Sequence, residues 1–272
     1  MSTAIAPDHT LPAVGGSHHF LLRRLHSLTG IVFGGYIIVH LLVNASLIQG
    51  MNPDVYQIQV DKIHSLPFLL GIEWAFIYLP ILFHTFYGIW ITLTGQPNAP
   101  HYPYIKNWFY VWQRISAIVI ALFIAFHVLA MKGLFGSSLR FDDHHATLST
   151  FAHINASPVL GYVVYPLGII ASCYHLSNGL WTAAITWGLT VSSAAQKRWG
   201  YICGAIFIFT LTCGMLALGS AIVGRAKVIH PAAASSSNLE SRSSKEVRNS
   251  NFEFPSNFEL RTSVFSAPQA HV

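Results

Sequence analysis

Hydrophobic residues along this chain fall into long runs that are separated by short groups of polar and charged residues. An α-helix needs about 20 residues to cross a hydrocarbon core of roughly 30 Å. Backbone polar groups find no water within lipid, so apolar segments of this length must be helices. Five segments reach or approach this length: 25–49, 73–94, 112–131, 157–187 and 199–223. The pattern therefore predicts a bundle of five transmembrane helices.

Composition supports an all-α membrane protein. Hydrophobic residues make up 53% of the chain and charged residues only 9%, which is far from the balance of a soluble domain. The first hydrophobic run follows Arg23 and Arg24 and is too long for the core of a cleaved signal peptide, so we expect it to stay in the protein. The tails at 1–19 and 228–272 are polar, and we expect disorder there, on either side of a transmembrane domain at 20–227.

The distribution of basic residues predicts the orientation. Six Lys and Arg residues flank the spans on the side of the N-terminus and three flank them on the other side: Arg23, Arg24, Lys106, Arg114, Lys197 and Arg198 against Lys62, Lys132 and Arg140. The side richer in Lys and Arg is usually cytoplasmic, so the N-terminus is predicted in the cytoplasm. The net charge of +5 suits anionic headgroups of the lipid bilayer, and no motif indicates nucleic acid as a partner.

The cysteines exclude two kinds of redox centre. Cys173, Cys203 and Cys213 lie in hydrophobic runs, and none has a second cysteine at metal-site spacing. An iron–sulfur cluster needs several thiolates, and a covalently attached c-type haem needs Cys-x-x-Cys-His. Any cluster that works with this chain must therefore belong to a partner.

Four histidines lie inside the predicted spans, where an ionisable side chain is rare and indicates a function. His40, His84, His127 and His175 occupy one each of the first four spans. A single such histidine is more often a hydrogen-bonded packing residue, but one per helix favours metal ligation. Imidazole is the commonest protein ligand of metals, and haem iron takes one axial ligand on each side. Four histidines thus predict two bis-histidine haem sites.

Depth in the membrane predicts how the histidines pair. Consecutive spans run antiparallel, and a helix rises about 1.5 Å per residue. His40 and His127 both lie near the end of a span that runs outward, so both are close to the outer face. His175 lies eighteen residues into a span that runs inward, which leaves His84 as its partner by elimination.

Glycines distinguish one of the two pairs. Gly88 and Gly179 each follow a histidine of the His84 and His175 pair by four residues. A glycine one turn away on the same helix face leaves room for a flat macrocycle. The alternative is that these glycines only allow close packing of helices.

Polar residues near the span ends are further candidates. His26 and Gln113 each precede a buried histidine by fourteen residues, which returns to nearly the same helix face. With Ser27 and Ser116 they are candidates for contacts with haem propionates or a quinone headgroup, the alternative being ordinary interfacial residues. Glu73 is a candidate for proton exchange with a quinone, the alternative being a solvated carboxylate at a helix start.

Residues 142–145, the acidic and histidine-rich run Asp-Asp-His-His, look like a metal site but fall in a loop between spans. A solvated loop is the favoured interpretation of that run.

Several motifs resemble a known family, the five-helix dihaem cytochrome b subunit of bacterial succinate:menaquinone oxidoreductases and fumarate reductases. The resemblance covers about residues 23–223 and rests on RRLHSLTG, IIVHLLVN, LPILFHTFYG, YIKNWFYVWQR, FHVL and YHLSNGLWTAAITWG. Together these motifs are specific, although each alone is weak.

The resemblance implies two b-type haems, a proximal one on His84 and His175 beside the iron–sulfur subunit and a distal one on His40 and His127. It also implies that the chain anchors succinate dehydrogenase in the bacterial cytoplasmic membrane. Electrons from succinate would come through a flavoprotein that carries FAD and the succinate site, then through the iron–sulfur subunit, and would reduce menaquinone near the outer side.

Two departures from the family and two rival functions remain. Some family members have a glutamate where this chain has Cys173, which puts a proton route through the fourth span in doubt, and the extended C-terminal tail is unlike that of compact members. The nearest rival is a dihaem cytochrome b of another quinone-linked dehydrogenase, such as a formate dehydrogenase or hydrogenase. The other is a transporter without haem whose histidines bind substrate or protons.

Overall fold

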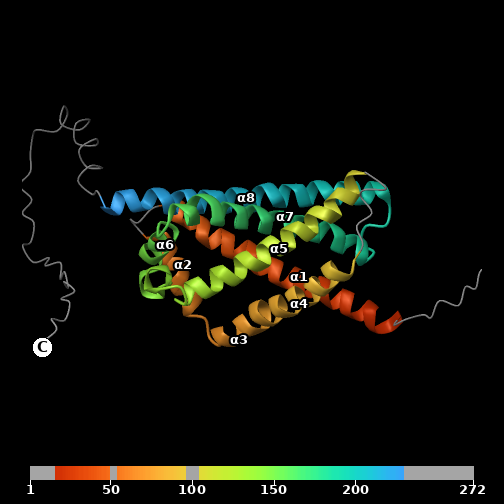
Figure 1. The fold of residues 1–272 in the computed structure, drawn as a ribbon, viewed down its shortest axis with the longest axis horizontal. Coiled ribbons are helices and arrows are strands. Elements are labelled where there is room, and N and C mark those ends of the chain that lie inside the picture. Colours follow the sequence, from red (N-terminus) through yellow and green to blue (C-terminus); the bar gives the residue numbers. More distant parts are fainter. Residues whose placement is uncertain (1–15, 50–53, 96–103, 230–272) are drawn as a thin grey trace, which may run out of the picture. The chain divides into compact units, whose positions relative to one another are not determined.

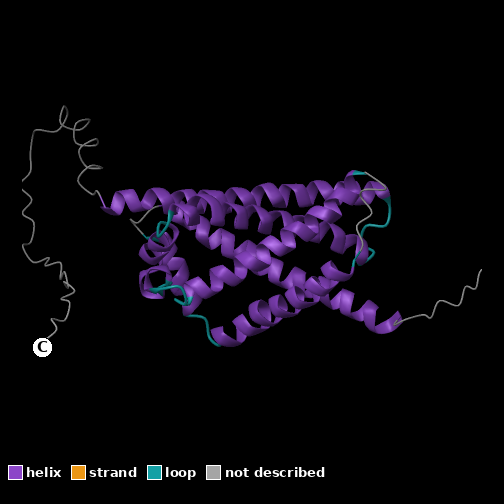
Figure 2. Cartoon of the chain, viewed as in Figure 1, coloured by secondary structure: helices purple, strands orange, loops and turns teal. Residues whose placement is uncertain are grey.

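The structure, a computed structural model, describes residues 16–49, 54–95 and 104–229. Within these ranges the regular elements are all helices, as Figure 2 shows. The fold class predicted from the sequence is thus confirmed. Most of the predicted N-terminal tail, and the C-terminal tail beyond Ile229, lie outside the described residues.

Five helical segments of the described chain are long and apolar enough to cross a membrane. They are formed by α1 (Gly16–Ala45) with η1 (Ser46–Gln49), by α3 (Leu69–Glu73), η2 (Trp74–Tyr78) and α4 (Leu79–Thr94), by α5 (Ile105–Met131), by η5 (Leu160–Val164) with α7 (Tyr165–Thr186), and by α8 (Ser193–Ile229). Four of them begin before the predicted positions, because a helix continues through polar end turns that a hydropathy pattern leaves out.

Two spans contain a wide turn directly before a proline. In η2 the Leu79 N–H donates to the Trp74 carbonyl, and in η5 the Tyr165 N–H donates to the Leu160 carbonyl, five residues back in each case. Pro80 and Pro166 then open α4 and α7. Proline lacks an N–H and its ring collides with the carbonyl four residues earlier, and a π-helical turn relieves this conflict without ending the helix. The two helices that continue carry His84 and His175.

The spans pack side by side in Figure 1, where α7 lies against α5 and α8, and α1 lies against α4 and α8. Large apolar side chains that do not line the cavity remain exposed, such as Leu122 at 70% and Ile208 at 65% of their surface. That much exposed apolar surface is what lipid, rather than water, tolerates.

A cap of short elements closes one end of the bundle, where Figure 1 shows α2 (Val55–His64) beside α6 (Ala146–Ile154). The Gln57 side chain joins α2 to η4 (Asp143–His145) and α6: its Nε2 donates to the Asp143 carbonyl and its Oε1 accepts from the Ala146 N–H, both at 2.7 Å. Buried apolar side chains gather beneath the cap, among them Tyr56, Val60 and Phe151. The best-packed core of the described chain therefore lies at this end.

The acidic and histidine-rich run lies at the surface of this cap. His145 pairs with Asp142 and His64 pairs with Asp143, each with 3.0 Å between nitrogen and oxygen. The hydrogen bond from His145 holds the pKa of Asp142 below its usual range. The side chains of His145 and Asp142 keep 68% and 50% of their surface exposed, which fits a solvated loop.

Arg114 closes the C-terminal end of α4 from the neighbouring helix α5. Its guanidinium donates to the carbonyls of Ile91 at 3.1 Å, Thr92 at 3.2 Å and Gly95 at 2.9 Å. The last carbonyls of a helix lack partners within it, and a cation at this end also favours the helix dipole. A Cβ at position 95 would overlap the guanidinium, so only glycine leaves room for this cap.

Replacing Arg114 by Gln is expected to lower stability by about 1–3 kcal/mol, since charge-assisted bonds to three partly buried carbonyls are lost. Gly95→Ala should have a similar effect because it displaces the same guanidinium. Thermal unfolding in detergent, followed by circular dichroism, measures both. Gly204→Ala is the control, because a Cβ there meets nothing within 4 Å; equal unfolding temperatures for all three variants would contradict the capping role.

Candidate functional site

The structure brings the four histidines of the spans together in the two pairs that depth predicts. The ring centroids of His40 and His127 lie 6.0 Å apart, and the planes of the rings meet at 78°. Those of His84 and His175 lie 6.1 Å apart, at 88°. The first pair joins α1 to α5 and the second joins α4 to α7, so each pair bridges two helices.

These separations match two imidazoles on opposite sides of one metal ion. With histidine–metal bonds of about 2 Å, the two ring centroids lie on the order of 6 Å apart. Each pair offers two protein ligands, too few for a metal ion held by side chains alone. Two axial ligands are what a haem iron takes from the protein, because the macrocycle supplies the others.

Hydrogen bonds at Nδ1 fix which nitrogen of the second pair is free. The His84 Nδ1 lies 2.9 Å from the His26 carbonyl, and the His175 Nδ1 lies 3.2 Å from the Gln113 carbonyl. A carbonyl only accepts, so Nδ1 carries the proton in both rings and Nε2 keeps its lone pair. Ligating histidines usually donate their other N–H in this way, which sets the tautomer and the ring orientation.

The first pair is held differently. The His127 Nδ1 lies 2.9 Å from the Tyr165 hydroxyl, a side-chain partner on another helix. His40 has only long contacts within its own helix, 3.5 Å from Nδ1 to the Tyr36 hydroxyl and 3.4 Å from Nε2 to the Asn44 amide. At these lengths hydrogen bonds orient a ring weakly. Within the described chain, His40 is thus the least constrained of the four.

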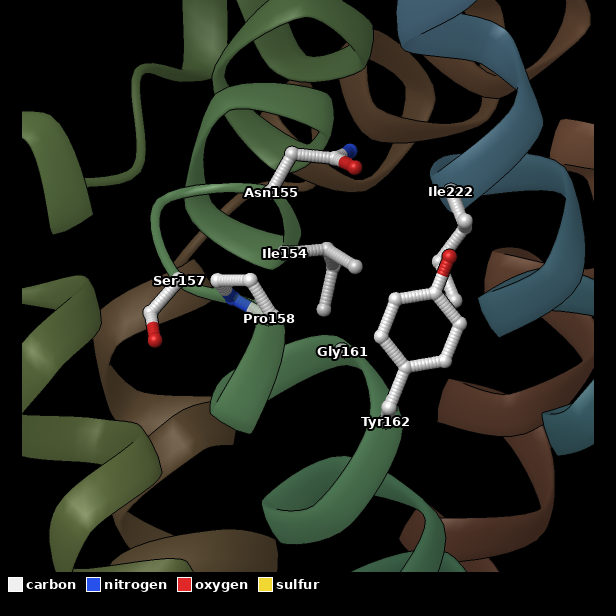
Figure 3. Close-up of a pocket in the computed structure, with 7 residues that line it drawn as sticks. All are labelled: Ile154, Asn155, Ser157, Pro158, Gly161, Tyr162 and Ile222. Atoms are coloured by element: carbon white, nitrogen blue, oxygen red, sulfur yellow. The ribbon is translucent and has the colours of Figure 1, made fainter.

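A single large cavity is lined by all four histidines. Its volume is about 1990 Å³, roughly twice the upper end of the range of about 300–1,000 Å³ that is usual for a small-molecule site. A second pocket, shown in Figure 3, lies between α6, η5 and α8 and measures only about 150 Å³. It contains no histidine and is too small for a macrocycle. The large cavity is therefore the candidate site.

A second histidine lies flat against His84. The His26 ring stacks on it with 4.0 Å between centroids and 9° between planes. Two glycines make this stack possible: a Cβ on Gly30 would come within 2.5 Å of the His84 ring, and a Cβ on Gly88 within 3.1 Å of His26. Each histidine thus packs on the glycine one turn beyond the other.

The stack changes the role expected of Gly88 and shows one residue that sequence reasoning missed. Gly88 and Gly179 both line the cavity, as a contact with a macrocycle requires, but the nearest neighbour of Gly88 is the His26 ring. Gly30 was missed, although the spacing of four residues between His26 and Gly30 repeats that between His84 and Gly88. That repeated spacing is the signal that could have found it.

His26 keeps one unsatisfied polar atom. Its Nδ1 is buried and has no hydrogen-bond partner within the described part of the chain. Buried polar atoms in proteins are nearly always paired, so an orphan in a residue that lines a cavity favours a partner from outside the chain. His26 also lines the cavity.

Gln113 and Ser116 lie beside the ligand candidate His175. Gln113 donates from Nε2 to the His175 carbonyl at 3.1 Å and accepts from the Asn178 amide at 2.8 Å. The Ser116 hydroxyl is buried, bonds to the Gln113 carbonyl at 3.0 Å and lies 3.3 Å from the His175 Nδ1. These residues join α5 to α7 around His175, and of the two only Gln113 also lines the cavity.

Ser27 and Glu73 occupy different ends of the site. The Ser27 hydroxyl accepts a hydrogen bond of 3.0 Å from the Trp187 indole N–H. The Arg24 guanidinium lies over the same indole ring in a cation–π contact. Glu73 is the last residue of α3 and lines the cavity. Cys173 is fully buried in α7.

One comparison with known proteins covers most of the chain. A curated protein of Bacillus subtilis (strain 168), described as "Succinate dehydrogenase cytochrome b558 subunit", is 34% identical over 209 residues. The match spans 75% of this chain and 98% of that protein. No family model matches the chain. The likeness thus extends over nearly the whole length of the relative rather than over one span.

Proposed function

Because the chain belongs to the family of succinate dehydrogenase cytochrome b subunits, we propose that it binds two b-type haems, one on His40 and His127 and one on His84 and His175. As a multi-pass member of this family, it is the membrane anchor of an oxidoreductase complex. The observation that carries the proposal is the pair of centroid distances, 6.0 and 6.1 Å, because each fits axial ligands on one iron.

Three further features fit a haem. The tautomers of His84 and His175 leave Nε2 available, the cavity has room for more than one large ligand, and the His26 Nδ1 is buried without a partner in the described chain. We infer that His26 receives a propionate, with Gln113, Ser27 and Ser116 as the polar surroundings of that end. We also infer that Gly88 and Gly179 leave space for the macrocycle.

Bound haem supplies one-electron transfer. This chain's residues contribute ligation and orientation: two backbone carbonyls hold His84 and His175, and helix packing at Gly30 and Gly88 keeps the His26 and His84 rings parallel. The surface that lines the cavity is mostly apolar. Lower dielectric around a metal centre shifts its potential, so the lining is part of the function.

The proposed partners are two further subunits. Because the three cysteines of this chain are dispersed, we infer that iron–sulfur clusters belong to one of them, and we propose that succinate is oxidised on an FAD flavoprotein. We propose that the N-terminus of this chain is cytoplasmic and that these subunits bind on the same side, next to the His84 and His175 pair. Menaquinone then reacts toward the other face, where Glu73 is the candidate for proton exchange. The membrane would be the bacterial cytoplasmic membrane.

The test is a redox-titrated spectrum of the purified complex. We expect two low-spin haems per copy of this chain, with separate midpoint potentials, and a flavoprotein and an iron–sulfur protein that co-purify with it. One haem or none per chain would overturn the dihaem proposal. Co-purification of a formate dehydrogenase or hydrogenase in place of the flavoprotein would favour the rival dehydrogenase, although the 34% identity to a succinate dehydrogenase subunit supports the present assignment.

A further inference from the structure

A chain of three hydrogen bonds leads away from His127 into the cap. The His127 Nδ1 lies 2.9 Å from the Tyr165 hydroxyl, that hydroxyl lies 2.6 Å from the His153 Nε2, and the His153 Nδ1 lies 2.7 Å from the Leu139 carbonyl. His153 is fully buried, and Tyr165 is 7% exposed. The residues come from α5, α7, α6 and η3 (Ser137–Leu139), so four separate elements hold the chain in place.

The Leu139 end of this hydrogen-bond series fixes which group donates in each of its three bonds. The Leu139 carbonyl can only accept, so the His153 Nδ1 carries the proton and, in the neutral ring, Nε2 accepts. Burial lowers the pKa of His153 and so favours the neutral ring, although the bond to Leu139 opposes this shift. Tyr165 then donates its only proton to His153.

The same logic reaches the metal-binding nitrogen. Because the Tyr165 proton points to His153, the Tyr165 oxygen can only accept from His127, so the His127 Nδ1 is protonated and its Nε2 keeps the lone pair. A hydroxyl that donates becomes a better acceptor, so His153 strengthens the bond between Tyr165 and His127. The tautomer needed for metal ligation is thus set from outside the transmembrane segments.

We propose that Tyr165 and His153 are positioning residues for His127, which set its tautomer, its ring orientation and its strength as an iron ligand. This inference rests on the proposed haem ligation by His127. Removing an acceptor from the N–H of a ligand imidazole makes the imidazole a weaker donor to iron, which stabilises the ferrous state. Tyr165 and His153 therefore hold the midpoint potential of the haem bound by His40 and His127 low.

Packing keeps the Tyr165 contact fixed. The Phe123 ring stacks on His127 with centroids 5.8 Å apart and meets Tyr165 edge to face at 5.4 Å. Gly168, one turn after Tyr165, leaves room for Phe123, because a Cβ there would overlap the ring. Tyr165 itself belongs to the buried apolar cluster under the cap.

The arrangement separates the two haem sites. His84 and His175 donate to backbone carbonyls, which no side-chain substitution removes, whereas His127 donates to a side chain. A substitution at Tyr165 should therefore change one haem only. That selectivity is a property which a general loss of packing would not produce.

The experiment measures the midpoint potential and the electron paramagnetic resonance spectrum of each haem in the purified complex. The signal that His127→Ala removes identifies the haem in question. In Tyr165→Phe, which keeps the ring, we expect that haem to shift to higher potential by on the order of tenfold in its reduction equilibrium, or about 59 mV. The other haem should keep its potential.

His153 provides a second variant and a rescue. His153→Leu removes the acceptor for the Tyr165 proton and should shift the same haem, whereas His153→Gln can donate to Leu139 and accept from Tyr165 and should restore the potential toward the wild-type value. Tyr36→Phe is the matched control, because its hydroxyl lies 3.5 Å from the His40 Nδ1, and its shift should be much smaller.

The outcomes decide between the two proposals. A wild-type complex without haem would end the proposed function. Two haems in the wild type, with neither signal changed in Tyr165→Phe and His153→Leu, would overturn this inference alone. A shift in these two variants that is confined to the other haem would also overturn this inference. Loss, in either variant, of only the haem identified by His127→Ala supports it.

Discussion

Replacing either histidine of a pair by alanine is expected to remove one and the same haem from the complex. His84→Ala and His175→Ala should each abolish one low-spin signal, and His40→Ala and His127→Ala should each abolish the other. The physical reason is that each pair lies at the distance of two axial ligands, and a low-spin b-type haem needs both. Haem content and reduced-minus-oxidised spectra of the membranes measure the loss.

His144→Ala is the control for these variants, because His144 is an exposed residue of η4 and does not line the cavity. Both haems should remain in it. If His84→Ala and His175→Ala removed different haems, the pairing would be wrong, even with two haems in the wild type. The result would then favour ligand pairs that each combine one histidine from His40 and His127 with one from His84 and His175.

Adding one methyl group at Gly30 is expected to displace His84 and to weaken the haem that His84 and His175 bind. The Cβ of Gly30→Ala would lie 2.5 Å from the His84 Cε1 and 2.7 Å from its Nδ1. The ring must move, and with it the hydrogen bond to the His26 carbonyl that fixes the tautomer. Loss of such support for a ligand costs about 10–100-fold in metal affinity.

Gly35→Ala is a close control, because it adds the same methyl group to the same helix where nothing lies within 4 Å. Haem stoichiometry of the purified complex distinguishes the variants: Gly30→Ala should retain mainly the haem of His40 and His127, and Gly35→Ala should retain both. Equal haem content in the two variants would show that the stack of His26 on His84 does not position the ligand.

Much of the fold could be predicted from the pattern of apolar and polar residues. Lipid requires every backbone polar group to be paired within the chain, so five long apolar runs can form only helices, and the structure confirms all five. Depth could also be calculated, because the rise per residue of a helix is constant. Counting residues from the polar flanks was therefore enough to place His40 level with His127, and elimination then left His84 as the partner of His175; the structure brings the same two pairs together.

The rotation of each helix and its contacts with other helices could not be calculated in this way. Pro80 and Pro166 can be read from the sequence, but the sequence pattern did not predict the π-helical turns that let both helices continue past these prolines. From the sequence pattern, Arg114 was grouped with the basic residues that flank the spans. In the folded chain its guanidinium caps the C-terminal end of α4.

By itself, then, the sequence determined the number of spans, their depth and the four histidines, because these depend on distances along the chain. Only the tertiary structure decided what surrounds each histidine. Gly30 meets His84 from another helix, and His153 reaches Tyr165 from the cap, because such contacts depend on how elements distant in the chain turn toward one another. The neighbours that set a ligand's tautomer are selected by this packing, which no periodicity along a single helix specifies.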